Sequence, residues 1–343
     1  MTSRRITDRF VLFALFLLAL VVLCVSIRYG AIDFSIDNIL GALASLLPGG
    51  AQPSLDQRIF LELRLPRAVL CVLVGASLGV GGALMQALFR NPIVEPGLVG
   101  TSSGAAFGSA LFFVLGGIVD IGSIWGLPVA ACIGGIVSTY LVFILARSRE
   151  DGRATIVSLL LTGLAVNALF MSAIGFLSYI ARDPQARSIT FWSLGTLSGA
   201  NWRSVAIVGV TTVGGVILAL RYAKQLNALM IGEDEATYLG VNVNRLKWIV
   251  LSINVVIVAV ATAFTGVIGF VGLVVPHILR MLHGADNRFL ILGSALTGAI
   301  LLSLADLIAR LSLRPAELPI GIVTSVVGVP VFLYLLRHRK YVF

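Results

Sequence analysis

The chain alternates long apolar runs with short polar segments, and this alternation constrains its fold more than any single motif. Crossing the core of a bilayer takes about 20 apolar residues in a helix, so such runs predict membrane spans. Together with short connections they account for nearly all of the 343 residues. We therefore expect an all-α polytopic membrane protein forming one transmembrane domain over residues 1–343. The ten runs lie near residues 10–28, 67–89, 98–118, 124–146, 156–180, 203–221, 246–265, 267–283, 289–310 and 319–336.

Composition supports this class and leaves little room for a soluble domain. Hydrophobic residues make up 58% of the chain and charged residues 12%, whereas soluble domains carry roughly 25% charged residues. The first apolar stretch, from Phe10 to Ile27, is longer than the apolar part of a signal peptide, and no small-residue cleavage motif follows it. We interpret it as an uncleaved anchor. The three cysteines lie within apolar runs at no metal-like spacing, which is typical of packing residues.

The distribution of Lys and Arg predicts the orientation, because cytoplasmic loops carry the excess of basic residues. Of the 25 basic residues, 16 lie in connections on the side of the N-terminus and 9 on the other side. We therefore expect both termini in the cytoplasm. The net charge of +9 then reflects this bias rather than nucleic-acid binding.

The longest cytoplasmic connection in this topology, residues 222–245, contains the acidic segment GEDEATYLG at 232–240. Apolar residues recur close to helical spacing around it, Gly232 interrupts them and Gly240 ends them, which predicts two short helices joined at a glycine. An anionic leaflet repels acids, so we expect the hairpin to bury its apolar face on a partner protein. The alternative is a solvated connector on the membrane surface. The apolar set is Leu226, Leu229, Met230, Ala236 and Leu239.

Five long stretches, covering most of the chain, carry a resemblance to a known family. They read LRLPRAVLCVLVGASLGVGGALMQALFRNPIVEPGLVGTSSGA (63–105), SITFWSLGTLSGANW (188–202), NALMIGEDEATYLGVNV (227–243), GFVGLVVPHILRMLHGADNRFLILG (269–293) and ADLIARLSLRPAELPIGIVTSVVGVPVFLYLL (305–336). In these stretches and their order the chain resembles the permease subunits of FecCD and BtuC type, which serve bacterial ABC importers for iron chelates and vitamin B12.

The resemblance implies an assembly in the bacterial inner membrane. It implies a homodimer of type II importer permeases with ten helices each, two cytoplasmic ABC ATPase subunits and a periplasmic binding protein. Because a P-loop needs Gly-Lys followed by Ser or Thr and no lysine here follows a glycine, ATP and Mg²⁺ would bind to the partner ATPase. We therefore expect no catalytic residue, cofactor or metal site in this chain.

The resemblance also gives a role to the acidic segment. In such importers the loop after the sixth span forms the coupling helices that sit in a cleft of the ATPase, here residues 226–241. The candidate coupling residues are Leu229, Gly232, Glu233, Asp234, Glu235, Tyr238, Leu239 and Gly240.

Three arginines lie at the periplasmic ends of spans: Arg64, Arg67 and Arg310. The resemblance implies that they accept acidic residues from the two lobes of the binding protein, whereas the residues alone also fit helix ends anchored at the headgroups. Asp306 precedes Arg310 by one helical turn, so an i,i+4 ion pair is expected, which holds the arginine in place.

One further site follows from the same resemblance, and another from the residues themselves. The turn FRNPIVEPG (89–97) and the start of the fifth span narrow the inner exit in the family, which makes Asn91, Ile93, Ile156 and Val157 the candidate cytoplasmic gate. The residues FWSLG (191–195), which include Trp192, indicate first an interfacial aromatic belt. The second interpretation is a periplasmic substrate vestibule, for which Arg187 and Trp192 are the candidates.

The expected cargo is an anionic iron chelate, with haem preferred. Arg182, Arg187 and Arg203 make the periplasmic face basic, which suits the haem propionates; a ferric siderophore and vitamin B12 are the alternatives. An ion-coupled secondary transporter would carry titratable groups near the bilayer midplane. Asp306, the clearest acid within a span, lies near a span end, which disfavours this class of transporter. His277 follows Pro276 within a span, and we interpret it as structural rather than as a haem or metal ligand.

Overall fold

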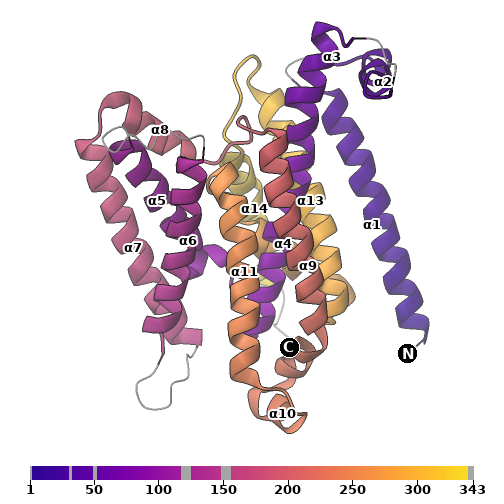
Figure 1. Cartoon of the computed structure of the whole chain (residues 1–343). Helices are drawn as coiled ribbons and strands as arrows, with labels where there is room; N and C mark the ends of the chain where they lie inside the picture. Colours follow the sequence, from indigo (N-terminus) through magenta and orange to yellow (C-terminus); the bar gives the residue numbers. More distant parts are fainter. Residues whose placement is uncertain (1, 31–32, 49–51, 117–124, 148–155, 339–343) are drawn as a thin grey trace.

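The computed structural model describes residues 2–30, 33–48, 52–116, 125–147 and 156–338, and these residues form helices and connections without a strand (Figure 1). The fold class is therefore all-α, as predicted. The helices are α1 (Thr2–Arg28), α2 (Ile36–Ala44), α3 (Leu55–Ile59), η1 (Phe60–Arg64), α4 (Leu65–Leu88), η2 (Pro96–Val99), α5 (Thr101–Leu115), α6 (Gly126–Leu145), α7 (Ile156–Ile180), α8 (Asp183–Ser193), α9 (Trp202–Ile231), α10 (Glu233–Tyr238), α11 (Val243–Thr265), α12 (Val271–His283), α13 (Asn287–Ser312) and α14 (Ile320–His338).

Over the described residues, each of the ten apolar runs overlaps one of these helices. Within the described residues, seven helices are long and apolar enough to cross a membrane, and α5, α12 and α14 are apolar but shorter over the part described. The number of ten spans stays a prediction. Figure 1 shows α2, α3 and α8 at one end of the bundle and α10 at the other. The beginning of α1 and the end of α14 lie in the half that holds α10; that this half faces the cytoplasm stays a prediction.

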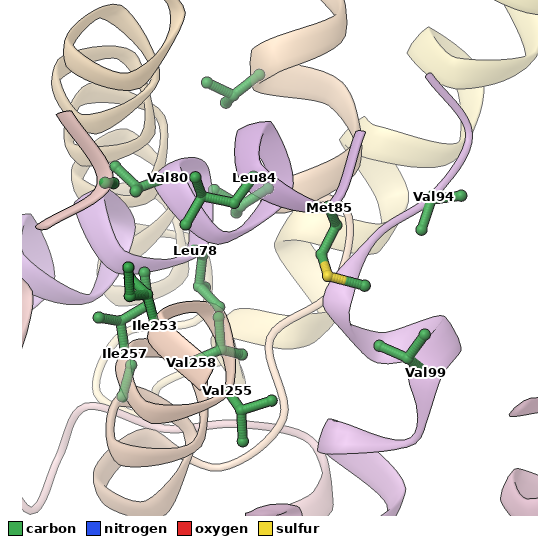
Figure 2. Packing of buried hydrophobic residues seen from close by; sticks show 14 of the residues in the cluster. Leu78, Val80, Leu84, Met85, Val94, Val99, Ile253, Val255, Ile257 and Val258 are labelled. Atoms are coloured by element: carbon green, nitrogen blue, oxygen red, sulfur yellow. The ribbon is translucent and has the colours of Figure 1, made fainter. Parts of the chain in front are cut away.

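The centre of the bundle is α4, which packs against α9, α11, α12 and α13. Figure 2 shows Leu78 of α4 beside Val258 of α11 in this core. A buried hydrogen bond from Asn254 Nδ2 to the carbonyl of Gly81, 2.7 Å, joins the same two helices. Helices α5, α6, α7 and α8 form a second group that contacts the first through α11 (Figure 1).

The contact between α4 and α13 depends on glycines. A Cβ at Gly75 would lie 2.4 Å from the carbonyl oxygen of Gly298, and one at Gly79 would lie 2.2 Å from that of Ser294. Small residues let two backbones approach closely where lipid leaves no hydrophobic difference to drive association. The glycine-rich second run is therefore a packing face.

One expectation about the acidic connection is wrong. The structure has no separate short helix before Gly232, because α9 continues for 30 residues from Trp202 to Ile231. The charged residues Arg221 and Lys224 end the apolar run but not the helix, since both residue types are good helix formers. The hairpin is therefore α10 joined directly to a membrane helix.

Candidate functional site

The structure brings Arg64, Arg67 and Arg310 together at the α8 end of the bundle, around the carboxylate of Asp306. Arg67 donates to Asp306 Oδ1 from Nη2 at 2.8 Å and from Nε at 3.1 Å. Arg310 donates from Nε to Oδ2 at 2.8 Å, so the predicted i,i+4 pair is confirmed. The side chains of Asp306 and Arg310 are only 1% and 2% exposed. Asp306 therefore forms one buried ion pair within α13, with Arg310, and a second one between α13 and α4, with Arg67.

The remaining donors of Arg310 face the end of α1. Its Nη1 donates to the carbonyl of Tyr29 at 2.8 Å, and its Nη2 donates to the hydroxyl and the carbonyl of Ser26 at 2.8 and 3.1 Å. Arg310 is thus buried and bonded through all three nitrogens within the chain. Its position suits holding the site together more than meeting another protein directly.

Arg64, like Arg67, is half-buried. It donates to the carbonyl of Tyr29 at 3.2 Å, and its guanidinium lies 5.6 Å from the centre of the Phe34 ring. The Tyr29 carbonyl therefore accepts hydrogen bonds from Arg64 and Arg310 together. Cation–π contact with Phe34 fixes the direction of the Arg64 side chain.

Glu317 completes this cluster, and no pattern in the sequence points to it. Arg67 Nη1 donates to both carboxylate oxygens of Glu317, at 2.9 and 2.8 Å. The two residues are 250 positions apart, so no spacing in the sequence relates them. The quoted stretch 305–336 contains Glu317, but only the packing of α13 on α4 reveals its partner.

Two cavities adjoin the cluster. The first, about 330 Å³, is lined by Phe34, Arg64, Arg67, Arg310 and Glu317 among others. The second, about 300 Å³, is lined by Arg67 and Glu317 together with Phe191, Thr196 and Ile320 and their neighbours. Arg67 and Glu317 belong to both linings, so their ion pair lies between the two cavities.

The two vestibule candidates on α8 have different environments. Arg187 is exposed, with its guanidinium 5.6 Å from the centre of the Phe191 ring. Trp192 is only 7% exposed and packs in a cluster with Ile174, Leu177 and Ile189. The exposed aromatic that lines the second cavity is therefore Phe191 and not Trp192.

At the opposite end, α10 is fixed to the bundle through its own residues. Lys247 of α11 forms an ion pair with Glu233, with 2.7 Å between Nζ and Oε1. Ala236 and the preceding Leu229 are fully buried. Leu226 is buried as well, so the apolar surface available to a partner is smaller than the sequence predicts. The exposed apolar side chains are Ile231, Tyr238 and Leu239, the last two at 90% and 66%.

A left-handed glycine ends the hairpin. Gly240 has φ +81°, its N–H donates to the carbonyl of Thr237, and the N–H of Val241 donates to that of Ala236. This is the Schellman arrangement, in which glycine takes the left-handed position without a steric penalty. Gly232 is buried between the two helices, and Asp234 and Glu235 are exposed.

The gate candidates lie on the connection after α4 and at the start of α7. Asn91 Oδ1 accepts from the N–H of Ile93 at 3.0 Å, which folds the turn, and Ile93 is exposed. Val157 is exposed on the first turn of α7. The side chain of Ile156 lies outside the described part of the chain.

Glu95, in the same connection, is a titratable group that the sequence analysis did not single out. Its carboxylate accepts a hydrogen bond from the backbone N–H of Phe270, while burial raises its pKa from 4.5 to about 7. Among the described residues, no three His, Cys, Asp or Glu side chains lie together as a metal site. His277 is buried within α12.

Three comparisons with known proteins give one result. The model of the FecCD transport family matches residues 17–338. The hemin transport system permease protein HmuU of Yersinia pestis is 44% identical over 283 residues, which are 82% of this chain and 84% of that protein. The cobalamin import system permease protein BtuC of Halobacterium salinarum is 42% identical over 84% of this chain and 76% of that protein. The inward-facing structure of a metal-chelate type ABC transporter superimposes with a TM-score of 0.82 at 33% identity, covering 95% of this chain and 98% of the other.

Proposed function

This chain belongs to the FecCD transport family, and from that premise we propose that it is the membrane pathway by which an ABC importer brings haem into the cytoplasm. The family defines the broader function. The chain is the multi-pass permease subunit of an ABC importer for an iron chelate, haem or vitamin B12, and ATP is bound and hydrolysed by partner subunits.

Haem is preferred as cargo on two grounds. The hemin permease of Yersinia pestis is among the most similar relatives. The α8 end is also basic: Arg64, Arg67 and Arg310 outnumber the two carboxylates bound to them, and Arg187 is exposed beside an aromatic ring. A bis-propionate ligand with an aromatic body fits such a surface. A ferric siderophore and vitamin B12 are the alternatives, the latter favoured by the cobalamin permease at 42% identity.

The proposed assembly is a homodimer in the bacterial inner membrane, with two ATPase subunits at the α10 end and a periplasmic binding protein at the α8 end. In this assembly Arg64 and Arg67 meet acidic side chains of the binding protein, and Arg310 supports them from beneath. Charge complementarity of this kind speeds association and weakens as salt increases. Arg187 and Phe191 would form the rim of a substrate vestibule, with Trp192 packed behind them.

The observation that carries the proposed coupling is the attachment of α10 to two membrane helices. It continues α9 through Gly232 and is tied to α11 by Glu233 and Lys247. An ATPase that binds Tyr238 and Leu239, together with the exposed acids Asp234 and Glu235, would therefore move α9 and α11 together. Leu229 acts in this scheme as the buried support of the hairpin. The gate proposed at Asn91, Ile93, Ile156 and Val157 then opens by helix displacement.

Transport in vesicles tests this proposal against its alternatives. The purified chain and its ATPase are reconstituted, and candidate binding proteins loaded with haem, a ferric siderophore or cobalamin are added. We expect ATP-dependent uptake, greatest for haem. Greater uptake of another chelate contradicts the cargo, whereas uptake driven by an ion gradient without ATP indicates a secondary transporter.

A further inference from the structure

Arg67 binds two carboxylates whose surroundings differ. Asp306 is 1% exposed and is also bound by Arg310, so moving Arg67 away would leave Oδ1 of a buried carboxylate without its partner, which is unfavourable. Glu317 is 33% exposed and meets Arg67 through Nη1. Exposed ion pairs contribute little to stability. Glu317 is therefore the partner of Arg67 that can be exchanged.

The exchangeable pair lies where a docking protein would arrive. Arg67 and Glu317 line the first cavity with Arg64 and Arg310, and they separate it from the second cavity beside Phe191 and Ile320. A carboxylate entering the first cavity meets three guanidinium groups and competes with Glu317 for Nη1 of Arg67. Replacement of one carboxylate by another leaves the local charge balance unchanged.

We infer that Glu317 occupies a carboxylate-binding site on Arg67 whose second ligand is an acidic side chain of the docking protein, and that exchange of the two releases the connection 313–319. This inference rests on the proposed docking of a binding protein at the α8 end. It assigns Glu317 a competing role, so removing its charge strengthens docking. A purely structural role would predict weaker docking or none.

Release of the connection 313–319 also loosens the start of α14. Around Glu317 the backbone is held by bonds from the N–H of Leu318 to Ala309, from Ile320 to Gly195 and from Gly321 to Leu194. The Glu317 side chain adds a tie to α4 through Arg67. Its displacement frees the beginning of α14 from α4 and lets the two cavities join. Docking is thereby transmitted to a membrane helix.

The test compares Glu317→Gln with Glu62→Gln. Glu62 is an exposed acid on η1, two residues from Arg64, and it takes part in no ion pair among the described residues, so both changes remove one negative charge from the same face. Affinity is measured for the complex in nanodiscs, using the binding protein that supports uptake. Glu317→Gln should tighten binding roughly two- to five-fold. Glu62→Gln should change it by less than about two-fold.

The variant Arg64→Ala separates this inference from the proposed function. If Arg64→Ala leaves binding unchanged, the docking face itself is wrong. If Arg64→Ala weakens binding while Glu317→Gln has no effect or weakens it, docking stands and the competing role of Glu317 is wrong. An equal gain in Glu62→Gln would also overturn it, because general charge would then explain the effect.

A second measurement needs no binding protein. Hydrogen–deuterium exchange is followed over residues 313–321 in the purified chain, with thermal unfolding as a check that both variants are folded. We expect faster exchange of this segment in Glu317→Gln and unchanged exchange in Glu62→Gln. Equal protection in the two variants shows that Glu317 does not hold the connection and overturns the inference.

Discussion

Asp306 binds two guanidinium groups while its own carboxylate is almost completely buried. Burial therefore separates residues that hold the site from residues that can meet a partner. Asp306 and Arg310 belong to the first kind, and Arg64 and Glu317, which water still reaches, belong to the second. The same distinction applies at the other end, where Leu229 supports α10 and Tyr238 is exposed.

Removal of the Asp306 charge should destabilise the chain strongly. In Asp306→Asn the guanidinium groups of Arg67 and Arg310 lose their shared counter-ion in a buried place, which costs about 3–5 kcal/mol. Asp37→Asn, at an exposed position in the first turn of α2, is the control and should change stability by less than about 0.5 kcal/mol. Thermal unfolding in detergent measures both. Equal stability of the two variants would contradict a central role for Asp306.

Glu95 gives the chain a pH dependence of stability. Its folded pKa, about 7, lies above the ordinary 4.5 because of burial, so the folded state binds the proton more tightly than the unfolded state. Stability should therefore fall as pH rises from 4.5 to about 7, by about 3 kcal/mol in all. The Glu95→Gln side chain stays neutral, so the free energy of unfolding of this variant should lack this part of the pH dependence. Unfolding by denaturant at pH 5 and pH 7.5 compares the two proteins, and identical slopes would show that Glu95 titrates normally.

At the scale of elements, backbone contact between α4 and α13 positions the charged cluster. Gly75 and Gly298 meet with no room for a Cβ. More than two turns further along, the same two helices carry Arg67, Asp306 and Arg310. Separation of the helices would therefore disturb the ion pairs as well as the packing. The site depends on how closely the two helices approach.

Gly298→Val should weaken this contact. The first added atom would lie 2.2 Å from the carbonyl oxygen of Gly75, and backbone cannot move aside as a side-chain end can, so we expect a loss of about 1–3 kcal/mol or more. Gly214→Ala within α9 meets nothing within 4 Å and should be neutral or stabilise by up to about 1 kcal/mol through helix propensity. Thermal unfolding compares the pair. A stable Gly298→Val variant would contradict close backbone contact.

At the scale of the whole molecule, the sequence predicts the membrane helices better than the site. Apolar runs locate ten helices because hydrophobicity is a local property. The extension of α9 to Ile231 is missed because Arg221 and Lys224 interrupt the apolar run while the helix continues through them. The pair of Asp306 and Arg310 follows from spacing along one helix. The contact of Arg67 with Glu317, and the burial of Arg310 against Ser26, depend on packing between distant elements, and spacing carries no sign of them.

We propose that work done by a separate ATPase reaches the membrane helices through α10. The direct test replaces residues 232–240 with a Gly/Ser segment of equal length in the reconstituted complex, and measures ATP hydrolysis and substrate uptake together. Tyr238→Ala combined with Leu239→Ala serves as a milder variant that keeps the hairpin backbone. We predict that the ATPase still hydrolyses ATP while uptake is lost with the flexible segment and reduced in the double variant. Full ATP-driven uptake through the flexible segment would contradict the claim.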